Sequence, residues 1–389
     1  MAVVAWLLLA LAVGSGVYCI LVVIAARHHL RVKPPSLKTE PGLSVLKPLH
    51  GLEEGLESNL RTIFEQSYNN YEVLMAVRTG DDLAVPLVRQ LQSEYPHISS
   101  RLLFVGEPPW VNAKTWSLHK MTEEAKHEIL VMSDSDIRVT PDFLRTLAAE
   151  FADPDVGVSS CPYRAVPGVG SPASTLEAIG MNTEFLATAL VARMLEGMKF
   201  ALGPTLTSRK QVIAEIGGWQ YLSEFLAEDF VLGNKASENG WKVLFSSYVV
   251  EHHIGAQSWR VNARHRIRWC RSTRRSRPAG YVGQLFTNPL PILLLLVLVK
   301  PEWWPVAMGV FAARIAAAIA TAAWILRDPL TLTKWYLLPI QDLLSFVFWV
   351  AGFFGTTVDW RGRKFEVLPD GRFTLKVNQA SANHHEDTR

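Results

Sequence analysis

Hydrophobic residues along the chain fall into long uninterrupted runs and into shorter alternating ones. Residues 3–25 carry no charged side chain and are mostly Leu, Val and Ala, and apolar character returns over 282–299, 303–326 and 335–355. A run of about 20 apolar residues spans the hydrocarbon core of a bilayer as a helix. The pattern therefore predicts membrane segments at both ends of the chain.

The region between these runs alternates between strand-like and helix-like patterns. Strands are predicted at 43–46, 71–77, 101–105 and 128–132. Apolar residues at helical spacing cover 55–65, 84–95 and 115–125. Such alternation is typical of βαβ units, so we expect an α/β domain with a mostly parallel sheet. No Gly-x-Gly-x-x-Gly turn follows the first predicted strand, which disfavours a dinucleotide-binding Rossmann site.

Basic residues indicate how the chain is oriented in a membrane. None precedes the first apolar run, whereas Arg27, Arg31 and Lys33 follow it. A cleaved signal peptide would carry its positive charge in front. The positive-inside bias therefore places the N-terminus outside and the following domain in the cytoplasm.

The patterns divide the chain into a membrane anchor with a basic flank, an α/β domain, a basic and aromatic interfacial segment, C-terminal membrane segments and a polar tail. These cover 1–33, 34–258, 259–281, 282–356 and 357–389, respectively. Three C-terminal spans would leave the C-terminus outside, whereas Arg361, Arg363 and Lys364 favour the inside. One of the apolar segments is therefore expected to be re-entrant or interfacial.

Composition agrees with a membrane protein. Hydrophobic residues make up 49% of the chain and charged residues 19%, which is too apolar for an ordinary soluble enzyme. The net charge of +3 gives no basis for general binding to polyanions. The three cysteines, Cys19, Cys161 and Cys270, are widely spaced, so neither a disulfide framework nor a cysteine metal site is predicted.

Two carboxylates follow the predicted strand at 128–132. Asp134 and Asp136 lie one residue apart, at the carboxyl edge of the sheet, where open α/β sheets bind ligands. Paired carboxylates at such an edge suit a hard cation, Mg²⁺ or Mn²⁺, which would neutralise a diphosphate. The alternative is a solvated turn after a strand.

Three further polar residues are candidates for donor binding. Asp81 and Asp82 follow the strand at 71–77 and are placed to accept hydrogen bonds from a nucleoside, or else they form an acidic loop. Lys114 precedes the strand that carries Asp134, where it would meet a phosphate unless it is a solvated surface charge.

Glu228 and Asp229 lie within the apolar sequence Phe-Leu-Ala-Glu-Asp-Phe. A partly desolvated carboxylate has a raised pKa and is a better general base. The alternative is an acid pair in the first turn of a helix.

Eight arginines lie between residues 260 and 277, with Trp259 and Trp269 interleaved. Nucleic acid is disfavoured as a partner because the stretch adjoins membrane segments, and a helix at the headgroup level explains the pattern better. Within it, Arg268 suits a contact with a diphosphate and Trp269 suits stacking on a sugar or ring.

Taken in order, these motifs resemble the ceramide glucosyltransferase family, and also the hopanoid-associated bacterial glycosyltransferases of the same lineage. The resemblance covers about residues 3–370 and rests on five ordered motifs, namely Lys47-Pro-Leu, Asp81-Asp82, Asp134, Glu228-Asp229 and Arg268-Trp269. It implies a GT-A-like fold in which Asp82 and Asp134 bind nucleotide and metal. It also implies that Asp229 is the base and that Arg268-Trp269 closes over the donor. His265 departs from the Gln or Arg usual at its position and is similar to the hopanoid-associated branch, which leaves the acceptor open.

The sequence thus predicts an inverting glycosyltransferase that moves a sugar, glucose from UDP-glucose in the first instance, to the hydroxyl of a membrane lipid such as ceramide. A hopanoid or other lipid acceptor, with N-acetylglucosamine or another hexose as the sugar, is the alternative. A processive polysaccharide synthase would need more membrane helices than this chain offers, and a non-enzymatic scaffold would not need these ordered motifs. The expected location is a bacterial inner membrane, with the catalytic domain in the cytoplasm.

Overall fold

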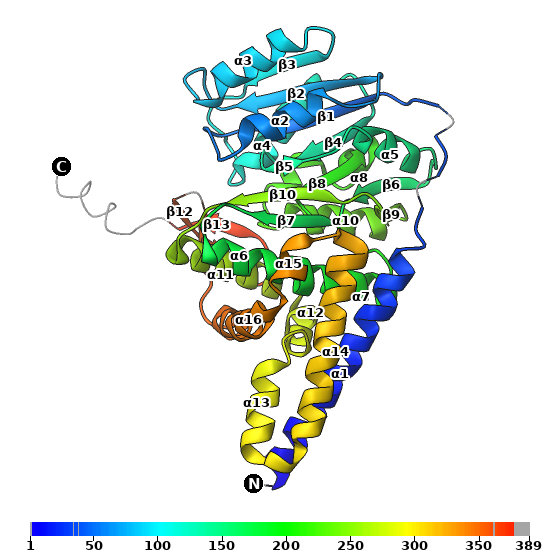
Figure 1. Ribbon diagram of the computed structural model, residues 1–389. Helices are drawn as coiled ribbons and strands as arrows, with labels where there is room; N and C mark the ends of the chain where they lie inside the picture. Colours follow the sequence, from blue (N-terminus) through cyan, green and yellow to red (C-terminus); the bar gives the residue numbers. More distant parts are fainter. Residues whose placement is uncertain (1, 34, 38, 361, 377–389) are drawn as a thin grey trace, which may run out of the picture.

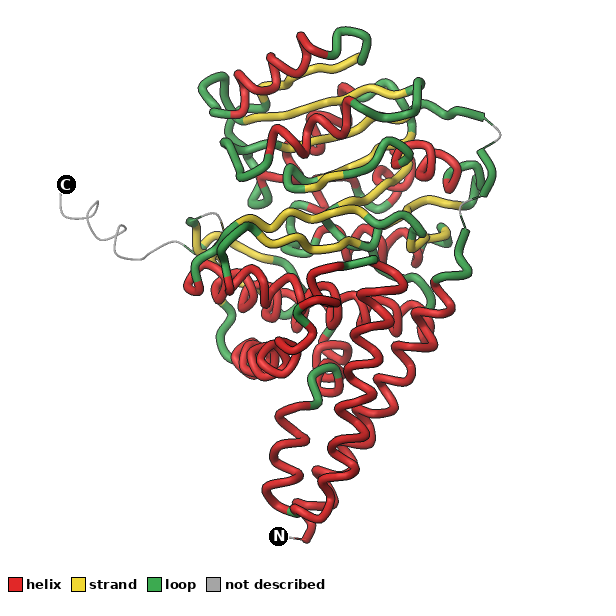
Figure 2. The backbone as a smooth tube through the Cα atoms, in the orientation of Figure 1, coloured by secondary structure: helices red, strands yellow, loops and turns green. Residues whose placement is uncertain are grey.

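The computed structural model describes residues 2–33, 35–37, 39–360 and 362–376. An α/β domain occupies one end, and a tapered bundle of helices projects from it (Figure 1). The coloured tube separates the two parts clearly, with strands confined to the domain (Figure 2).

The main sheet confirms the predicted mostly parallel arrangement. Within the described residues its seven strands follow the order β3-β2-β1-β4-β8-β6-β9. The strands β3, β2, β1 and β4 run parallel, β8 runs antiparallel between β4 and β6, and β9 is parallel to β6. Their bounds are β1 Leu43–Pro48, β2 Tyr71–Val77, β3 Ser99–Phe104, β4 Ile129–Ser133, β6 Val156–Ser160, β8 Thr205–Arg209 and β9 Lys242–Phe245.

Helices cover both faces of this sheet, which explains why β1, β2 and β4 are almost entirely buried. The three predicted helices are confirmed as α2 Leu56–Phe64, α3 Ala84–Glu94 and α4 Ala113–Glu124. The domain also contains α5 Phe143–Glu150, α6 Pro172–Gly180, α7 Leu186–Glu196, α8 Lys210–Glu215, α9 Gly218–Leu222 and α10 Glu228–Glu238. A π-helix, η1 (Met181–Phe185), joins α6 to α7.

A smaller sheet lies between the main sheet and the helical bundle (Figure 1). Its order is β5-β10-β7, with bounds Ile137–Arg138, Val250–Gly255 and Tyr163–Pro167. Successive side chains on a strand point to opposite faces. His252 therefore faces one side of this sheet, and its neighbour Glu251 faces the other.

The segment predicted as a polar tail from residue 357 is partly folded, which corrects that assignment. Three strands, β11 Thr357–Trp360, β12 Arg363–Val367 and β13 Phe373–Leu375, form an antiparallel sheet there. Val358, Phe365 and Phe373 form its buried cluster with Leu226. In strands this short, the alternation of apolar and polar residues is too brief to be recognised in the sequence. The rest of the tail, 377–389, lies outside the described residues.

The apolar segments fold as helices that differ in direction. The first is α1 (Ala2–His29), and the second is a pair bent by 52°, Pro278–Phe286 and Leu290–Val299. The third, Pro301–Leu326, comprises η3 (Pro301–Trp303), α14 (Trp304–Ile319) and the π-helix η4 (Ala320–Leu326). The fourth, Trp335–Gly352, comprises η5 (Trp335–Leu337) and α16 (Leu338–Gly352). By length and composition, three helices in the described chain can cross a membrane, or four if the bent pair counts as one span.

The direction of α16 bears on the prediction that one of the C-terminal apolar segments is re-entrant or interfacial. Figure 1 views α16 along its axis, whereas α1 and α14 run side by side along the bundle. The helix α16 packs against α6 and against α11 (Trp259–Ser276) at the base of the domain. Among the apolar helices, α16 therefore has the orientation that the predicted re-entrant or interfacial segment requires.

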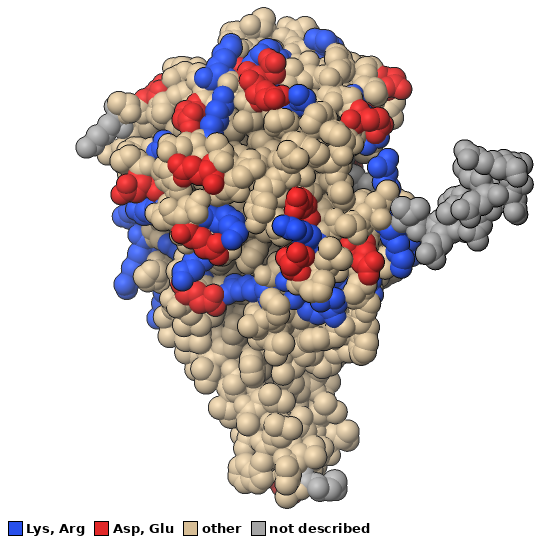
Figure 3. All heavy atoms as spheres, turned by 180° about the vertical axis from the view of Figure 1, so that it is seen from behind, with Lys and Arg blue, Asp and Glu red and all other residues tan. Residues whose placement is uncertain are grey.

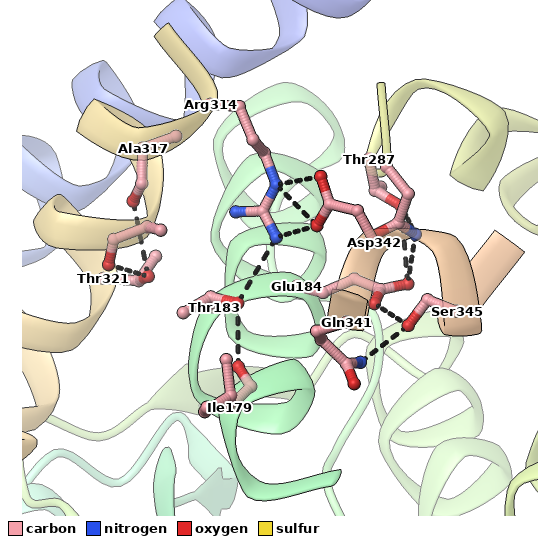
Figure 4. A network of polar contacts seen from close by, with 12 residues as sticks. Ile179, Thr183, Glu184, Thr287, Arg314, Ala317, Thr321, Gln341, Asp342 and Ser345 are labelled. Atoms are coloured by element: carbon pink, nitrogen blue, oxygen red, sulfur yellow. Dashed lines mark hydrogen bonds and ion pairs between the residues drawn. The ribbon is translucent and has the colours of Figure 1, made fainter. Parts of the chain in front are cut away.

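Polar side chains connect the apolar helices where they meet the domain (Figure 4). Arg314 of α14 donates hydrogen bonds to Asp342 of α16 at 2.8, 3.2 and 3.3 Å, and both residues are buried. Beside them, Ser345 donates to Glu184 of η1 at 2.6 Å, and Asn288 donates to Glu184 at 2.8 Å. Charged side chains on apolar helices are usually paired and face inward. This network therefore fixes α14, α16 and η1 relative to one another.

The surface charge changes abruptly between the domain and the bundle. Figure 3 shows mixed charges over the domain, almost none on the tapered end, and a band of Lys and Arg where the two meet. Such a band suits the anionic headgroups of a membrane surface.

Candidate functional site

A buried lysine holds the segment that carries the two predicted metal ligands. Lys47 lies in the parallel strand next to β4, and its Nζ donates to Ser133 Oγ at 3.2 Å and to the Asp134 carbonyl at 2.5 Å. Burial lowers the pKa of Lys47 to about 8, although Asp136 and Asp134 act in the opposite direction. The side chains of Asp134 and Asp136 remain about one-third exposed at the carboxyl edge of the sheet.

A second lysine connects Asp134 to Glu228, the neighbour of the predicted base. Lys114 is the second residue of α4. Its Nζ lies 2.8 Å from Asp134 Oδ1 and 3.3 Å from Glu228 Oε1. Asn112 caps this helix by accepting hydrogen bonds from the Lys114 and Thr115 amides. Burial alone would lower the pKa of Lys114, but Asp134 and Glu228 raise it above its ordinary value. Lys114 is therefore a cation shared by two carboxylates and not a solvated surface charge.

Asp136 is held by a histidine that the sequence did not reveal. His252 Nε2 lies 3.0 Å from Asp136 Oδ2. Burial raises the pKa of Asp136, but His252 and Lys47 together with a backbone hydrogen bond oppose it, and the pKa lies below the ordinary value. The second oxygen, Oδ1, is buried and has no hydrogen-bond partner within the described ranges. An unpartnered, ionised carboxylate oxygen is suited to a hard cation.

Asp229 lies in the first turn of α10, where it is partly buried. Burial raises the pKa of Asp229 to about 7, and the charge of Glu228 adds to this effect, while Lys114 opposes it. A Cβ on Gly203 would come within 2.8 Å of Asp229 Oδ2, so only glycine permits this approach. The next carbonyl, that of Pro204, accepts from the Asp134 amide at 3.1 Å, which connects both acids through one loop.

The two acids predicted to bind nucleoside differ in their surroundings. Asp82 is nearly buried and accepts from the amides of Gly51 and Ala84, both at 2.9 Å. It thus joins the loops that follow β1 and β2, at the same carboxyl edge as Asp134. Asp81 is exposed, and a hydrogen bond from Thr79 lowers its pKa.

The remaining predicted residues lie on α11, which begins shortly after β10. His265 Nδ1 is 2.8 Å from the buried carboxylate of Glu177, and its ring lies 4.5 Å from that of Trp269. Arg268 points to the C-terminal sheet, with its guanidinium 6.0 Å from the centre of the Trp360 ring. These residues therefore form a separate group from the carboxylates around Lys114.

Aromatic rings connect the two groups. Trp269 lies 6.4 Å from Phe185, Phe185 lies 5.3 Å from Tyr163, and Tyr163 meets His252 edge-on at 5.5 Å. Burial raises the pKa of Tyr163, and the charges of Asp229 and Glu177 raise it further. Tyr163 therefore lies within electrostatic reach of both groups.

Comparison with known proteins identifies the family. Residues 4–373 match the model of Glycosyl transferase family 21. The chain belongs to Glycosyl transferase family 21. It is 30% identical over 224 residues to ceramide glucosyltransferase 1 of Caenorhabditis elegans and 27% identical to ceramide glucosyltransferase 3 of the same organism. Each match covers 57% of this chain and 47% or 48% of the relative, so the chain spans about half the length of these curated relatives. The predicted resemblance to the ceramide glucosyltransferase family is confirmed.

A solved structure with a similar fold extends the comparison. The mannosyltransferase PcManGT from Pyrobaculum calidifontis, in complex with GDP-Man and Mn²⁺, matches with a TM-score of 0.53. The identity is 20%, and the match covers 89% of this chain and 97% of that chain. The likeness confirms the predicted GT-A-like fold of this family 21 chain.

Sequence reasoning missed several residues of the site, each for a physical reason. His252 and Tyr163 lie on the small sheet, whose strands gave too weak a pattern to be predicted. Glu177 lies in an apolar stretch, where a lone acid has no spacing partner. A lysine inside the apolar strand at 43–48 was a usable signal, because a buried Lys47 requires nearby oxygen partners.

Proposed function

We propose that this chain is an inverting glycosyltransferase that transfers glucose from UDP-glucose to the primary hydroxyl of ceramide. The observation that carries the proposal is the position of Asp229. A partly buried carboxylate with a pKa of about 7 lies against the loop at Gly203 and Pro204 that also holds Asp134, the acid at the carboxyl edge of the sheet. Its neighbour Glu228 shares Lys114 with Asp134. A base and a diphosphate site side by side are what a single displacement requires.

The residues at the sheet edge fit a divalent cation. Within the described residues, no group of three or more His, Cys, Asp or Glu side chains is placed to hold a metal by itself. Asp134 and Asp136 would therefore supply one carboxylate each, with Oδ1 of Asp136 unpartnered in the described ranges. Mg²⁺ and Mn²⁺ accept this arrangement when the diphosphate and water complete the ligands. When bound, the cation would stabilise the negative charge of the UDP leaving group.

The side chains around this position have distinct roles in the proposed reaction. Asp82 fixes the loop that meets the nucleoside, and Lys114 provides positive charge beside the diphosphate. Asp229 accepts the proton of the lipid hydroxyl as the oxygen attacks the anomeric carbon from the face opposite UDP. A single displacement inverts that carbon, so an α-linked donor yields a β-glycoside.

The α11 residues are proposed to complete the donor and acceptor pockets. Arg268 would contact the diphosphate, and Trp269 would form a wall against which a sugar or the acceptor packs. His265 is held by Glu177 and lies against Trp269, so it would orient that wall. Closure of α11 over the donor would bring these groups to the carboxylates.

The arrangement of helices supports a membrane location. The N-terminus of α1 lies at the tip of the bundle, and its basic end, Arg27 to His29, meets the domain. We therefore place the domain on the cytoplasmic side of a bacterial inner membrane. The base of the domain, including α11 and α16, would then lie at the headgroup level, where a lipid hydroxyl is available.

One alternative acceptor is proposed, and the histidine at position 265 favours it. A hopanoid or another lipid, with a hexose or N-acetylglucosamine as the sugar, would use the same carboxylates. A processive polysaccharide synthase is disfavoured because the described chain offers three or four helices that can span a membrane.

The test is product analysis in defined bilayers. The purified full chain is supplied with UDP-glucose, UDP-galactose or UDP-N-acetylglucosamine, and with ceramide, a hopanoid or diacylglycerol as acceptor. Mass spectrometry of the extracted lipids is expected to show one hexose on ceramide with UDP-glucose, in the β-configuration by NMR. Transfer to another acceptor alone would refute the ceramide assignment, and products with several sugars would refute the single transfer.

A further inference from the structure

A cavity of about 530 Å³ lies away from the carboxylates of the proposed active site. It opens where the ends of α1 and η4 meet the small sheet. The residues that line it include His29, Arg138, Arg164, Tyr248, Trp324 and Arg327. Its volume is within the range of sites for small ligands or headgroups.

One strand separates this cavity from the metal site. Glu251 lines the cavity, whereas the next residue, His252, points to the other face of the sheet and binds Asp136. Arg138 lies opposite Glu251 in the antiparallel pair of β5 and β10. A molecule in the cavity is therefore in a different place from the donor.

The charge of the cavity is positive. Its lining contains three arginines and a single carboxylate, Glu251. That carboxylate already has two partners, and its hydrogen bonds with His253 and Arg164 lower its pKa to about 2. Arg138 has only a 3.3 Å bond to Asn59, and Arg327 has no ion pair or side-chain hydrogen bond within the described ranges. Two guanidinium groups are thus left for an anion.

The backbone at Arg327 is held in an unusual conformation. Its φ is +49°, and it is the sole non-glycine residue with positive φ among those the structure describes. Side chains with a Cβ rarely adopt this conformation, whereas glycine adopts it freely. Arg164 Nη1 stabilises it by donating to the carbonyls of Leu326 and Arg327, both at 3.0 Å. Glycine would fit this position better than arginine. The presence of arginine here therefore indicates a function for its side chain.

The surroundings of the cavity match a membrane surface. His29 is the last residue of α1, and Leu326 is the last residue of η4. Arg27 lies over the ring of Trp324 at 5.5 Å, and Leu30 at the cavity is half exposed. Tryptophan and arginine together are typical of the headgroup level, with apolar surface below them for acyl chains.

We propose that this cavity binds the phosphate-bearing headgroup of an anionic membrane lipid. Arg327 and Arg138 contact the phosphate, and Trp324 packs against the glycerol and the first methylenes. The lipid is bound in addition to donor and acceptor, since it lies on the other face of β10. It fastens the end of α14–η4 to the small sheet that carries His252.

The test compares lipid retention by variants of the purified full chain. The protein is equilibrated with bilayers of phosphatidylglycerol and phosphatidylcholine, and the lipids retained in detergent are measured by native mass spectrometry. The wild-type chain is expected to retain one phosphatidylglycerol in preference to phosphatidylcholine. Arg327→Gly should reduce this preference about tenfold, the effect of losing one charge-assisted contact. The same variant should keep or raise the thermal midpoint, because glycine suits the positive φ.

Two controls make the outcome decisive. Arg31 is exposed two residues beyond the end of α1 and does not line the cavity, so Arg31→Gln should leave the preference unchanged. Arg138→Gln provides a second test within the cavity and should weaken it as Arg327→Gly does. Equal losses with Arg31→Gln would show a general basic surface and refute the cavity. Complete displacement of the lipid by millimolar glycerol phosphate would identify a soluble anion instead, and would also refute the lipid assignment.

Discussion

The ammonium group of Lys114 lies 2.8 Å from a carboxylate oxygen of Asp134, and within 3.3 Å of Glu228. One cation therefore connects the proposed metal ligand with the acid pair that contains the proposed base. Because charges in a half-buried site interact strongly, changing any one of these groups should alter the protonation of the others.

The pH dependence of transfer should report this connection. With a pKa of about 7, Asp229 is half protonated near neutrality, so kcat/KM should rise with pH up to about 7 and then level off. One unit below the pKa, the rate should be about tenfold lower, in proportion to the ionised fraction. Lys114 opposes the raised pKa, so Lys114→Met should move this limb to higher pH. Lys120→Met on the same helix, where Lys120 pairs with Glu123, should not move it.

Removing the base should affect turnover more than donor binding. Asp229→Asn keeps the shape of the side chain but cannot accept the proton, so kcat should fall by ~10²-fold or more. Binding of UDP-glucose, measured by calorimetry, should change little. Turnover within a few-fold of the wild type would place the base elsewhere, and Glu228→Gln would then be the variant to examine.

The proposed metal site predicts dependence on a divalent cation. EDTA should abolish transfer and Mg²⁺ or Mn²⁺ should restore it, while Asp134→Ala should be inactive but still insert into membranes. His252 binds the other ligand, Asp136, so His252→Gln should raise the cation concentration needed for half-maximal activity by about tenfold or more. Full activity in excess EDTA would exclude the cation from the reaction.

Arg268 and Arg264 provide a matched pair on α11. They are one turn apart, and Arg264 meets Asp359 at 3.6 Å at the surface. Arg268→Ala should raise the KM for UDP-glucose strongly, because a charge-assisted contact with phosphate is lost. Arg264→Ala should change it less than twofold, as exposed ion pairs contribute little (about 0–1 kcal/mol). Equal effects in the same lipid would mean that α11 acts only through its overall charge.

The buried ion pair of Arg314 and Asp342 predicts a non-additive effect on stability. Arg314→Met or Asp342→Leu alone leaves one charge unpaired and should lower the free energy of unfolding by about 3–5 kcal/mol. The double variant has no unpaired charge and should lose much less. Thermal unfolding of all four proteins in the same detergent measures the coupling, and simple additivity would contradict the role assigned to the pair in fixing α14 against α16.

Much of the fold followed from residue patterns that are local. The strands at 71–77 and 128–132 were recognisable because parallel strands buried on both faces consist of continuous apolar residues. The apolar segments were recognisable by length, since a bilayer requires about 20 residues per helix. The small sheet and the sheet at 357–375 escaped, because strands of two to six residues gain their stability from partners distant in sequence.

The sequence alone determined which chemical groups the protein possesses, their order and their nearness to a membrane. Asp134 and Asp229 could be named because an acid after an apolar run must either face solvent or find a partner. Which partner it finds depends on contacts between residues far apart in the chain, such as Asp136 with His252 and Lys114 with Glu228. The direction of α16 and the cavity at Arg327 were likewise decided by tertiary packing, because hydropathy measures the length of an apolar helix but not the direction in which its neighbours hold it.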